Sequence, residues 1–350
     1  MSIVEINNLV KKYGDNVAVN DLSLNIDSKG VYGFLGPNGA GKSTTMNVLT
    51  GYIGATSGTV IINGYDIFKE PEEAKKNVGY LPEIPPLYQD MTVYEYLEFV
   101  SKIKKIKKEE RKACIEQSLE MTRTTEVRER LIRNLSKGYK QRVGIAQAIM
   151  GMPDLIILDE PTVGLDPKQI IEIRDLIRNL GKEHTVILSS HILTEISEVC
   201  ENIFIISQGK LVASGREEEL IEELAGENRI EAIIKGDANE IENILDKFGC
   251  KHSIETLDDE KCKAQIVTSR DIDIREGLFF ALAEKKMPLL ELKFKTKSLE
   301  DLFIELTTEY KAQPKKKSLK FKKKNSEKLD DKNLADNLKN EEKEVQEVEK

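Results

Sequence analysis

Cysteine is scarce in this sequence, and its spacing does not suit a metal or redox site. The four cysteines are Cys114, Cys200, Cys250 and Cys262, with no C-x-x-C pair and no histidine at ligand spacing from them. This pattern excludes a zinc knuckle, a thiol redox motif and a disulfide scaffold, and it favours a reducing compartment such as the cytosol.

Long hydrophobic runs are also missing. Nowhere do about 18 apolar residues follow one another, so we expect no segment that spans a membrane alone. The first residues, MSIVEINNLVKKYG, contain no apolar core of a secretory signal, and we expect none here. Any role at a membrane is therefore expected to come through a partner.

Neither sign of charge dominates the sequence. The 53 Lys and Arg against 61 Asp and Glu give a net charge of −8, which argues against nucleic acid as a partner. Apolar residues make up 39% and charged residues 33%, which excludes a collagenous, mucin-like or wholly disordered chain. The length of 350 residues predicts about two domains with some excess.

Residues 311–350 form a tail of two charge blocks. Residues 311–325 hold eight Lys and no acid, whereas residues 326–350 hold nine acids against five Lys. This composition favours a solvated, disordered extension. The alternative is that the basic block, with Leu319 and Phe321 among its lysines, contacts anionic lipid headgroups.

Residues 228–310 predict a small α+β accessory domain. The order of the patterns is βαββαβ, that of a ferredoxin-like sandwich, with strands at 229–235, 252–257, 262–269 and 289–296 and helices at 238–249 and 275–287. A further amphipathic helix over 298–310 opens with a cap formed by Ser298 and Asp301. We find no catalytic cluster in this region and interpret it as regulatory or as a part used in assembly.

Residues 1–225 carry the candidate chemistry. Short apolar strands are predicted at 31–36, 155–160 and 185–190, and the patterns between them are helical, above all over 85–150. This alternation predicts an α/β domain with a parallel sheet and a helical subdomain.

A glycine-rich loop joins the first of these strands to a helix. Residues 36–43, GPNGAGKS, match the G-x-x-x-x-G-K-[ST] pattern of the P-loop. Its glycines allow successive N–H groups to face phosphate oxygens, and the following helix N-terminus adds its positive dipole. We expect Lys42 to face the β- and γ-phosphates and the Ser43 hydroxyl to bind Mg²⁺.

Two acids end the second strand, LIILDE (155–160). The carboxyl ends of strands are where α/β proteins place their sites. We expect Asp159 to hold the Mg²⁺ shell and Glu160 to polarise the attacking water. Together with the loop, these acids predict a P-loop nucleotidase without deciding its family.

Four further features decide the family. The segment LSKGY (135–139) opens a helical stretch and resembles the LSGGQ signature of ABC ATPases. Gly164-Leu165-Asp166 resembles the D-loop, His191 the switch histidine and Tyr13 the aromatic that stacks on adenine. Over about 310 residues the chain is similar to the exporter branch of ABC ATPases, nearest to the subfamily with gliding-motility and antibiotic-resistance ATPases.

The resemblance implies a homodimer or heterodimer in which each ATP lies between one subunit's P-loop and the partner's signature. It also implies a separate membrane-spanning permease, which would hold the dimer at the cytoplasmic side of the membrane. The implied catalytic residues are Glu160, His191 and Lys42, and the implied Mg²⁺ ligands are Ser43, Asp159 and Glu83. The residues implied in ATP binding are Tyr13, Gly36, Pro37, Asn38, Gly39, Ala40, Gly41, Lys42, Ser43, Thr44, Glu83, Ser136 and Gly138.

Three residues in two motifs depart from the family pattern. The signature has Lys137 and Tyr139 where Gly and Gln are usual, and Glu83 stands where most ABC ATPases carry a Gln that senses the γ-phosphate. A carboxylate can still bind a metal or water, but it cannot donate a hydrogen bond.

The leading interpretation is therefore the ATP-hydrolysing subunit of an ABC transporter. One alternative is an ABC protein acting on ribosomes or nucleic acid, which would be expected to carry two cassettes or long coiled coils, whereas this chain has one set of motifs. The other is a non-hydrolysing regulatory subunit, which would be expected to lose Lys42, Glu160 or His191, and all three are present.

Overall fold

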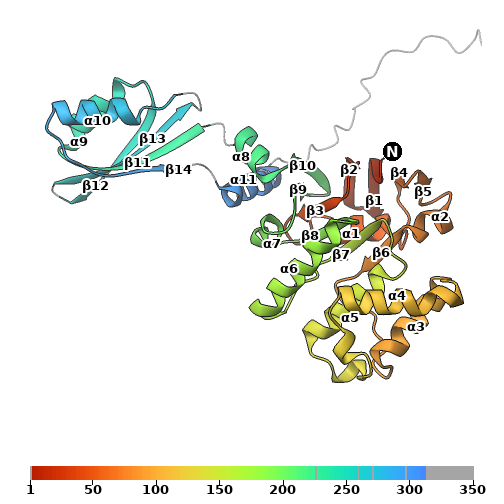
Figure 1. Cartoon of the computed structure of the whole chain (residues 1–350). Helices are drawn as coiled ribbons and strands as arrows, with labels where there is room; N and C mark the ends of the chain where they lie inside the picture. Colours follow the sequence, from red (N-terminus) through yellow and green to blue (C-terminus); the bar gives the residue numbers. More distant parts are fainter. Residues whose placement is uncertain (1, 225–226, 259, 270–271, 296–297, 313–350) are drawn as a thin grey trace, which may run out of the picture. The chain divides into compact units, whose positions relative to one another are not determined.

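The fold is seen in a computed structural model that describes residues 2–224, 227–258, 260–269, 272–295 and 298–312 (Figure 1). The charged tail predicted for residues 311–350 lies outside the described residues from residue 313 onward. Over the described ranges, no helix has both the length and the apolar character needed to cross a bilayer.

A six-stranded sheet forms the centre of the N-terminal domain. Its order is β10-β9-β3-β8-β7-β6, with β10 antiparallel to β9 and the other neighbours parallel. The strands are β3 (Gly30–Leu35), β6 (Val78–Leu81), β7 (Leu155–Asp159), β8 (Thr185–Ser190), β9 (Asn202–Ser207) and β10 (Lys210–Gly215). Every residue of β3, β7 and β8 is buried, as expected for continuous apolar strands covered on both faces.

A second, antiparallel sheet lies on one face of this centre, and the sequence analysis did not predict it. Its order is β2-β1-β4-β5, from strands β1 (Val4–Tyr13), β2 (Asn16–Ile26), β4 (Ser57–Ile62) and β5 (Tyr65–Asp66). Helix α1 (Lys42–Leu49) shares its core, because Met46 is buried with Ile6 of β1 and Phe34 of β3. A short helix α2 (Pro71–Lys76) leads into β6.

Helices cover the other face of the parallel sheet. These are α5 (Lys137–Ile149), α6 (Pro167–Gly181) and α7 (Leu193–Ser197), whose buried residues share a core with Val31 and Leu188 of the sheet. With α3 (Val93–Ile103) and α4 (Lys108–Met121), α5 also forms the predicted helical subdomain, which has its own apolar core. Helix α3 begins at a capping box between Thr92 and Glu95.

The accessory sheet has the predicted βαββαβ order. Its elements are β11 (Glu227–Lys235), α9 (Ala238–Asp246), β12 (Lys251–Asp258), β13 (Lys261–Ser269), α10 (Arg275–Glu284) and β14 (Leu289–Lys295). The strand order β12-β13-β11-β14, antiparallel throughout, is that of a ferredoxin-like sandwich. Both helices lie on one face of the sheet (Figure 1). They share with it one core of buried apolar residues, which includes Ile241 and Leu278.

The last described helix packs elsewhere. Helix α11 (Leu299–Ala312) begins at the predicted cap, where the Ser298 and Asp301 side chains and backbone amides bond reciprocally. Its Leu299 is buried in the core of the N-terminal domain, together with Leu220 of α8 (Glu217–Leu224). The helices that precede and follow the accessory sheet thus both belong to the N-terminal core. The division of the chain into domains at 1–225 and 228–310 stays a prediction.

A close approach between β6 and α5 generates a stability prediction. A Cβ at Gly79 would stand 2.2 Å from the Ala148 carbonyl oxygen, so Gly79→Ala must push β6 and α5 apart. We expect a loss of about 1–3 kcal/mol in the free energy of unfolding, measured by urea denaturation. Gly54→Ala is the matched control, since nothing lies within 4 Å of its Cβ position. Equal stability of the two variants would contradict this packing.

Candidate nucleotide site

The loop at residues 36–43 is held so tightly that two of its glycines admit no side chain. A Cβ at Gly36 would stand 2.4 Å from the Ile206 carbonyl oxygen, and one at Gly41 would stand 2.5 Å from that of Ala18. Gly41 also has a φ of 105°, which favours glycine. The P-loop pattern therefore reflects a backbone packed against β9 and β2.

Lys42 is enclosed by the loop that carries it. It is 5% exposed, and its Nζ donates to the carbonyl oxygens of Gly36 at 2.7 Å and Pro37 at 3.3 Å. Burial lowers the pKa of the Lys42 ammonium below its usual value, against the opposing effect of the Glu160 and Asp159 charges. The cation is thus desolvated beside the end of β7.

The start of α1 supplies unpaired donors beside Lys42. The hydrogen bond from the Thr45 N–H to the Gly41 carbonyl, 2.9 Å long, begins the helical pattern. The amides before Thr45 lie at the helix N-terminus, where N–H groups lack intrahelical partners and the dipole is positive. Loop, helix end and lysine together suit a polyanion such as a nucleotide phosphate chain.

Asp159 ends β7 and is 3% exposed. Its Oδ1 accepts a hydrogen bond from Ser43 Oγ at 3.3 Å and a short one from Ser189 Oγ. Ser189 lies opposite Asp159 in the parallel pairing of β7 with β8. Two hydroxyls from different elements therefore fix this carboxylate at the edge of the sheet.

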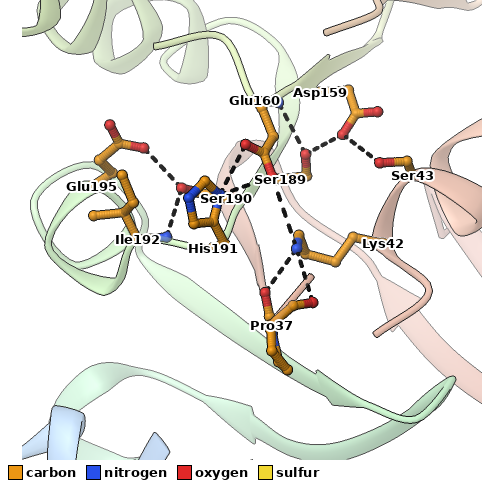
Figure 2. A network of polar contacts seen from close by, with 11 residues as sticks. Pro37, Lys42, Ser43, Asp159, Glu160, Ser189, Ser190, His191, Ile192 and Glu195 are labelled. Carbon is orange, nitrogen blue, oxygen red and sulfur yellow. Dashed lines mark hydrogen bonds and ion pairs between the residues drawn. The ribbon is translucent and has the colours of Figure 1, made fainter. Parts of the chain in front are cut away.

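Glu160 leaves the strand through a left-handed turn. Its φ is 48°, a conformation that is costly for a residue with a side chain. Its N–H donates to the Ser189 carbonyl at 3.2 Å and to Ser189 Oγ at 3.0 Å, which stabilises the turn. The turn directs the Glu160 carboxylate to Lys42, with 3.9 Å between Oε1 and Nζ (Figure 2).

His191 meets the same carboxylate from β8. Its Nδ1 lies 2.9 Å from Glu160 Oε2 and 3.1 Å from Oε1. Because a carboxylate only accepts, the Nδ1 carries the proton in this pair. Three strand ends, those of β3, β7 and β8, thus bring Lys42, Glu160 and His191 into one cluster (Figure 2).

The four predicted site residues outside the loop, the start of α1 and the strand ends have no contact with this cluster in the described part of the chain. Tyr13 is 49% exposed at the end of β1, with Lys11 Nζ 5.1 Å from its ring centroid. Glu83 is exposed beyond β6. Ser136 caps α5 by accepting from the Tyr139 N–H at 3.4 Å, and Gly138 lies in the first turn of that helix.

Three polar residues around the cluster, Ser189, Ser190 and Glu195, were not predicted from the sequence. Ser190 Oγ donates to Glu195 Oε2 at 2.8 Å, and the Ile192 N–H donates to Ser190 Oγ at 3.0 Å. The available signal was the serine pair at the end of TVILSS, since parallel neighbours of an acid-ending strand place their last residues beside those acids. Nothing comparable in the sequence indicated that Glu195 would lie near this cluster.

The residues present fit a Mg²⁺ ion shared with a nucleotide. Ser43 and Asp159 offer hard oxygen atoms, which Mg²⁺ prefers. Within the described ranges, no group of three or more His, Cys, Asp or Glu side chains could hold a metal alone. The remaining ligands would therefore have to be phosphate oxygens and water.

Comparison with known proteins agrees with this geometry. Residues 19–163 match the family model described as ABC transporter. Over 213 residues the chain is 42% identical to the bacitracin transport ATP-binding protein of Bacillus licheniformis, covering 60% of this chain and 69% of that protein. It is 32% identical over 306 residues to the linearmycin resistance ATP-binding protein of Bacillus subtilis, covering 87% and 98% of the two chains.

Solved structures with this fold are ATP-binding cassettes. One, described as the ATP-binding subunit of an ABC transporter, is 29% identical with a TM-score of 0.58, covering 63% of this chain and 92% of that one. Another is a dimeric cassette in a post-hydrolysis state with ADP and Pi, at 26% identity and a TM-score of 0.55, covering 61% and 98%. The chain therefore belongs to the ABC transporter family, as an ATP-binding and ATP-hydrolysing subunit.

Proposed function

We propose that the cluster of Lys42, Glu160 and His191 carries out ATP hydrolysis in this chain. The observation that carries the proposal is the convergence of this cation, carboxylate and imidazole at three neighbouring strand ends. Lys42 and the α1 amides would bind the β- and γ-phosphates, and Glu160 would take a proton from the attacking water. His191 would direct its Nδ1 proton at Glu160, and the other side of its imidazole ring would face the γ-phosphate.

Mg²⁺ would be held by Ser43 and Asp159. When bound, this ion neutralises charge on the phosphate oxygens. Ser189 would keep the Asp159 carboxylate oriented, because its hydroxyl donates to the same oxygen as Ser43. Glu83 is exposed and contacts neither Ser43 nor Asp159 in the described residues. It would become a Mg²⁺ ligand only if the segment after β6 moves toward the nucleotide.

Two copies of the domain would complete each site. Ser136 and Gly138 lie at the N-terminus of α5 and make no contact with the chain's own P-loop in the described residues. An anion-binding helix end separate from the phosphate loop of its own subunit suits a contact with the partner's nucleotide. The dimeric structure of a related cassette supports this arrangement.

The proposed partner is a separate membrane-spanning subunit, which would keep this chain at the cytoplasmic side of the membrane. The names of two relatives, for bacitracin transport and linearmycin resistance, support export as the direction. A groove of about 630 Å³, lined by Tyr52, Pro82, Pro86 and other residues, would receive the partner. Its charged lining residues are Lys75 and Lys104 with no acid, so an apolar segment carrying a carboxylate would fit.

Removal of the proposed base should stop turnover but not binding. Glu160→Gln keeps the side-chain shape and loses the basic carboxylate, so we expect kcat to fall about 10²–10⁴-fold. ATP affinity, measured by equilibrium binding, should persist, and an ATP-bound dimer should accumulate in size-exclusion chromatography. Glu183→Gln, at an exposed position before β8, is the control. Wild-type turnover in Glu160→Gln would show that another group is the base.

Mixing two inactive variants tests the composite site. Lys42→Ala disables a P-loop, and Ser136→Arg blocks a signature by bulk and charge. A heterodimer of the two would contain one site with both elements intact, so part of the ATPase activity should return on mixing. Crosslinking would verify that heterodimers form. Verified heterodimers without activity would contradict a site shared between subunits.

The groove can be tested apart from hydrolysis. Tyr52 is 78% exposed at its rim, and Tyr52→Glu would place a carboxylate where we expect the partner's own acid. Co-purification with the membrane subunit should drop sharply, while ATPase activity of the isolated chain stays unchanged. Ile304→Glu, at an exposed position on α11, is the control and should not affect co-purification. Unchanged recovery of Tyr52→Glu with the membrane subunit would place the contact elsewhere.

A further inference from the structure

Glu195 is a buried acid that the proposed chemistry does not use. It is 6% exposed on α7, and a buried carboxylate is unfavourable unless it is hydrogen-bonded. Its Oε2 accepts from Ser190 Oγ at 2.8 Å. Glu195 is therefore tied to the residue that precedes His191.

Ser190 also bonds to Ile192, the residue that follows His191, and so connects it to Glu195. The Ser190 hydroxyl has one proton, which it donates to Glu195, so its lone pairs can accept the Ile192 N–H at 3.0 Å. Ile192 is the N-cap of α7 and has no side chain able to cap, while Glu195 is the third helical residue. In a capping box these two positions bond directly, whereas here Ser190 stands between them.

These bonds affect the position of His191, because they hold the residues on both sides of it, Ser190 and Ile192. Its side chain is 37% exposed, so packing alone does not set the direction of the ring. The backbone held between Ser190 and Ile192 fixes the position from which the ring extends, and from there Nδ1 lies 2.9 Å from Glu160 Oε2 (Figure 2). We propose that Glu195 is a positioning residue for His191 that acts through Ser190, an inference that rests on the proposed role of His191 in hydrolysis.

The first test separates turnover from binding in the full chain. Glu195→Ala should lower kcat about 10–100-fold, as expected when a reacting group is misplaced. The KM for ATP should stay near its wild-type value, because the phosphate loop is untouched. Glu195→Gln keeps an oxygen that accepts the Ser190 proton, so it should retain most of the wild-type kcat. Wild-type kcat in Glu195→Ala would overturn the proposal.

The second test asks whether Glu195 acts through His191. In a His191→Ala background, Glu195→Ala should cause no further fall in the residual single-turnover rate. An equal fall in both backgrounds would overturn the proposal. Glu198→Ala is the matched control, because Glu198 is an exposed acid next to α7 that pairs with Arg174, and it should keep wild-type kcat. An equal loss in this control would overturn the proposal, because the effect would then not depend on the contact between Glu195 and Ser190.

A third variant keeps the proposal testable if Glu195→Ala does not fold. Ser190→Ala combined with Glu195→Met removes the buried carboxylate together with its donor, so no buried charge is left without a partner and only the Ile192 N–H loses its acceptor. It should lose kcat to the same extent, and wild-type kcat in this folded variant would overturn the proposal. Wild-type kcat in His191→Ala would instead contradict the proposed function. A large loss in His191→Ala with none in Glu195→Ala contradicts the positioning role alone.

Discussion

The parallel register of β3, β7 and β8 is the constraint on which the site depends. Leu35 pairs with Ser190, and Asp159 pairs with Ser189, so the three strands end at one level of the sheet. The residues that follow each strand are then neighbours, although Glu160 lies 118 positions after Lys42 and 31 positions before His191 in the chain. Any shift in this register would separate Lys42 from Glu160 and Glu160 from His191.

The site concentrates unfavourable features that the surrounding fold must offset. Glu160 adopts a left-handed backbone, Lys42 is desolvated, and Asp159 is almost fully buried. Each is stabilised by hydrogen bonds: Ser189 of the neighbouring strand bonds Glu160 and Asp159, and the carbonyls of its own loop accept from Lys42. Such preorganisation allows charged groups to act on a substrate without first rearranging their surroundings.

The accessory sheet has a separate core and adds nothing to this chemistry. Its apolar residues form a cluster of their own, whereas α8 and α11, which precede and follow it, pack in the core that also contains α7. Because α7 carries Glu195, that core supports both the helices flanking the accessory sheet and the helix next to His191. The regulatory or assembly role of residues 228–310 stays a prediction.

The sequence by itself determined the elements whose signals are local. The loop at 36–43, the apolar strands at 155–160 and 185–190 and the βαββαβ order of the accessory sheet were all predicted, because periodicity and glycine spacing act over a few residues. The antiparallel sheet was not predicted, although Gly14-Asp15 between β1 and β2 is a local signal for a two-residue hairpin, and the tertiary structure alone decided that β4 pairs with β1. It also decided that α11 packs on the N-terminal core and that Glu195 reaches Ser190. These outcomes depend on which buried surfaces and polar groups meet in space, and no local pattern in a single chain encodes that meeting.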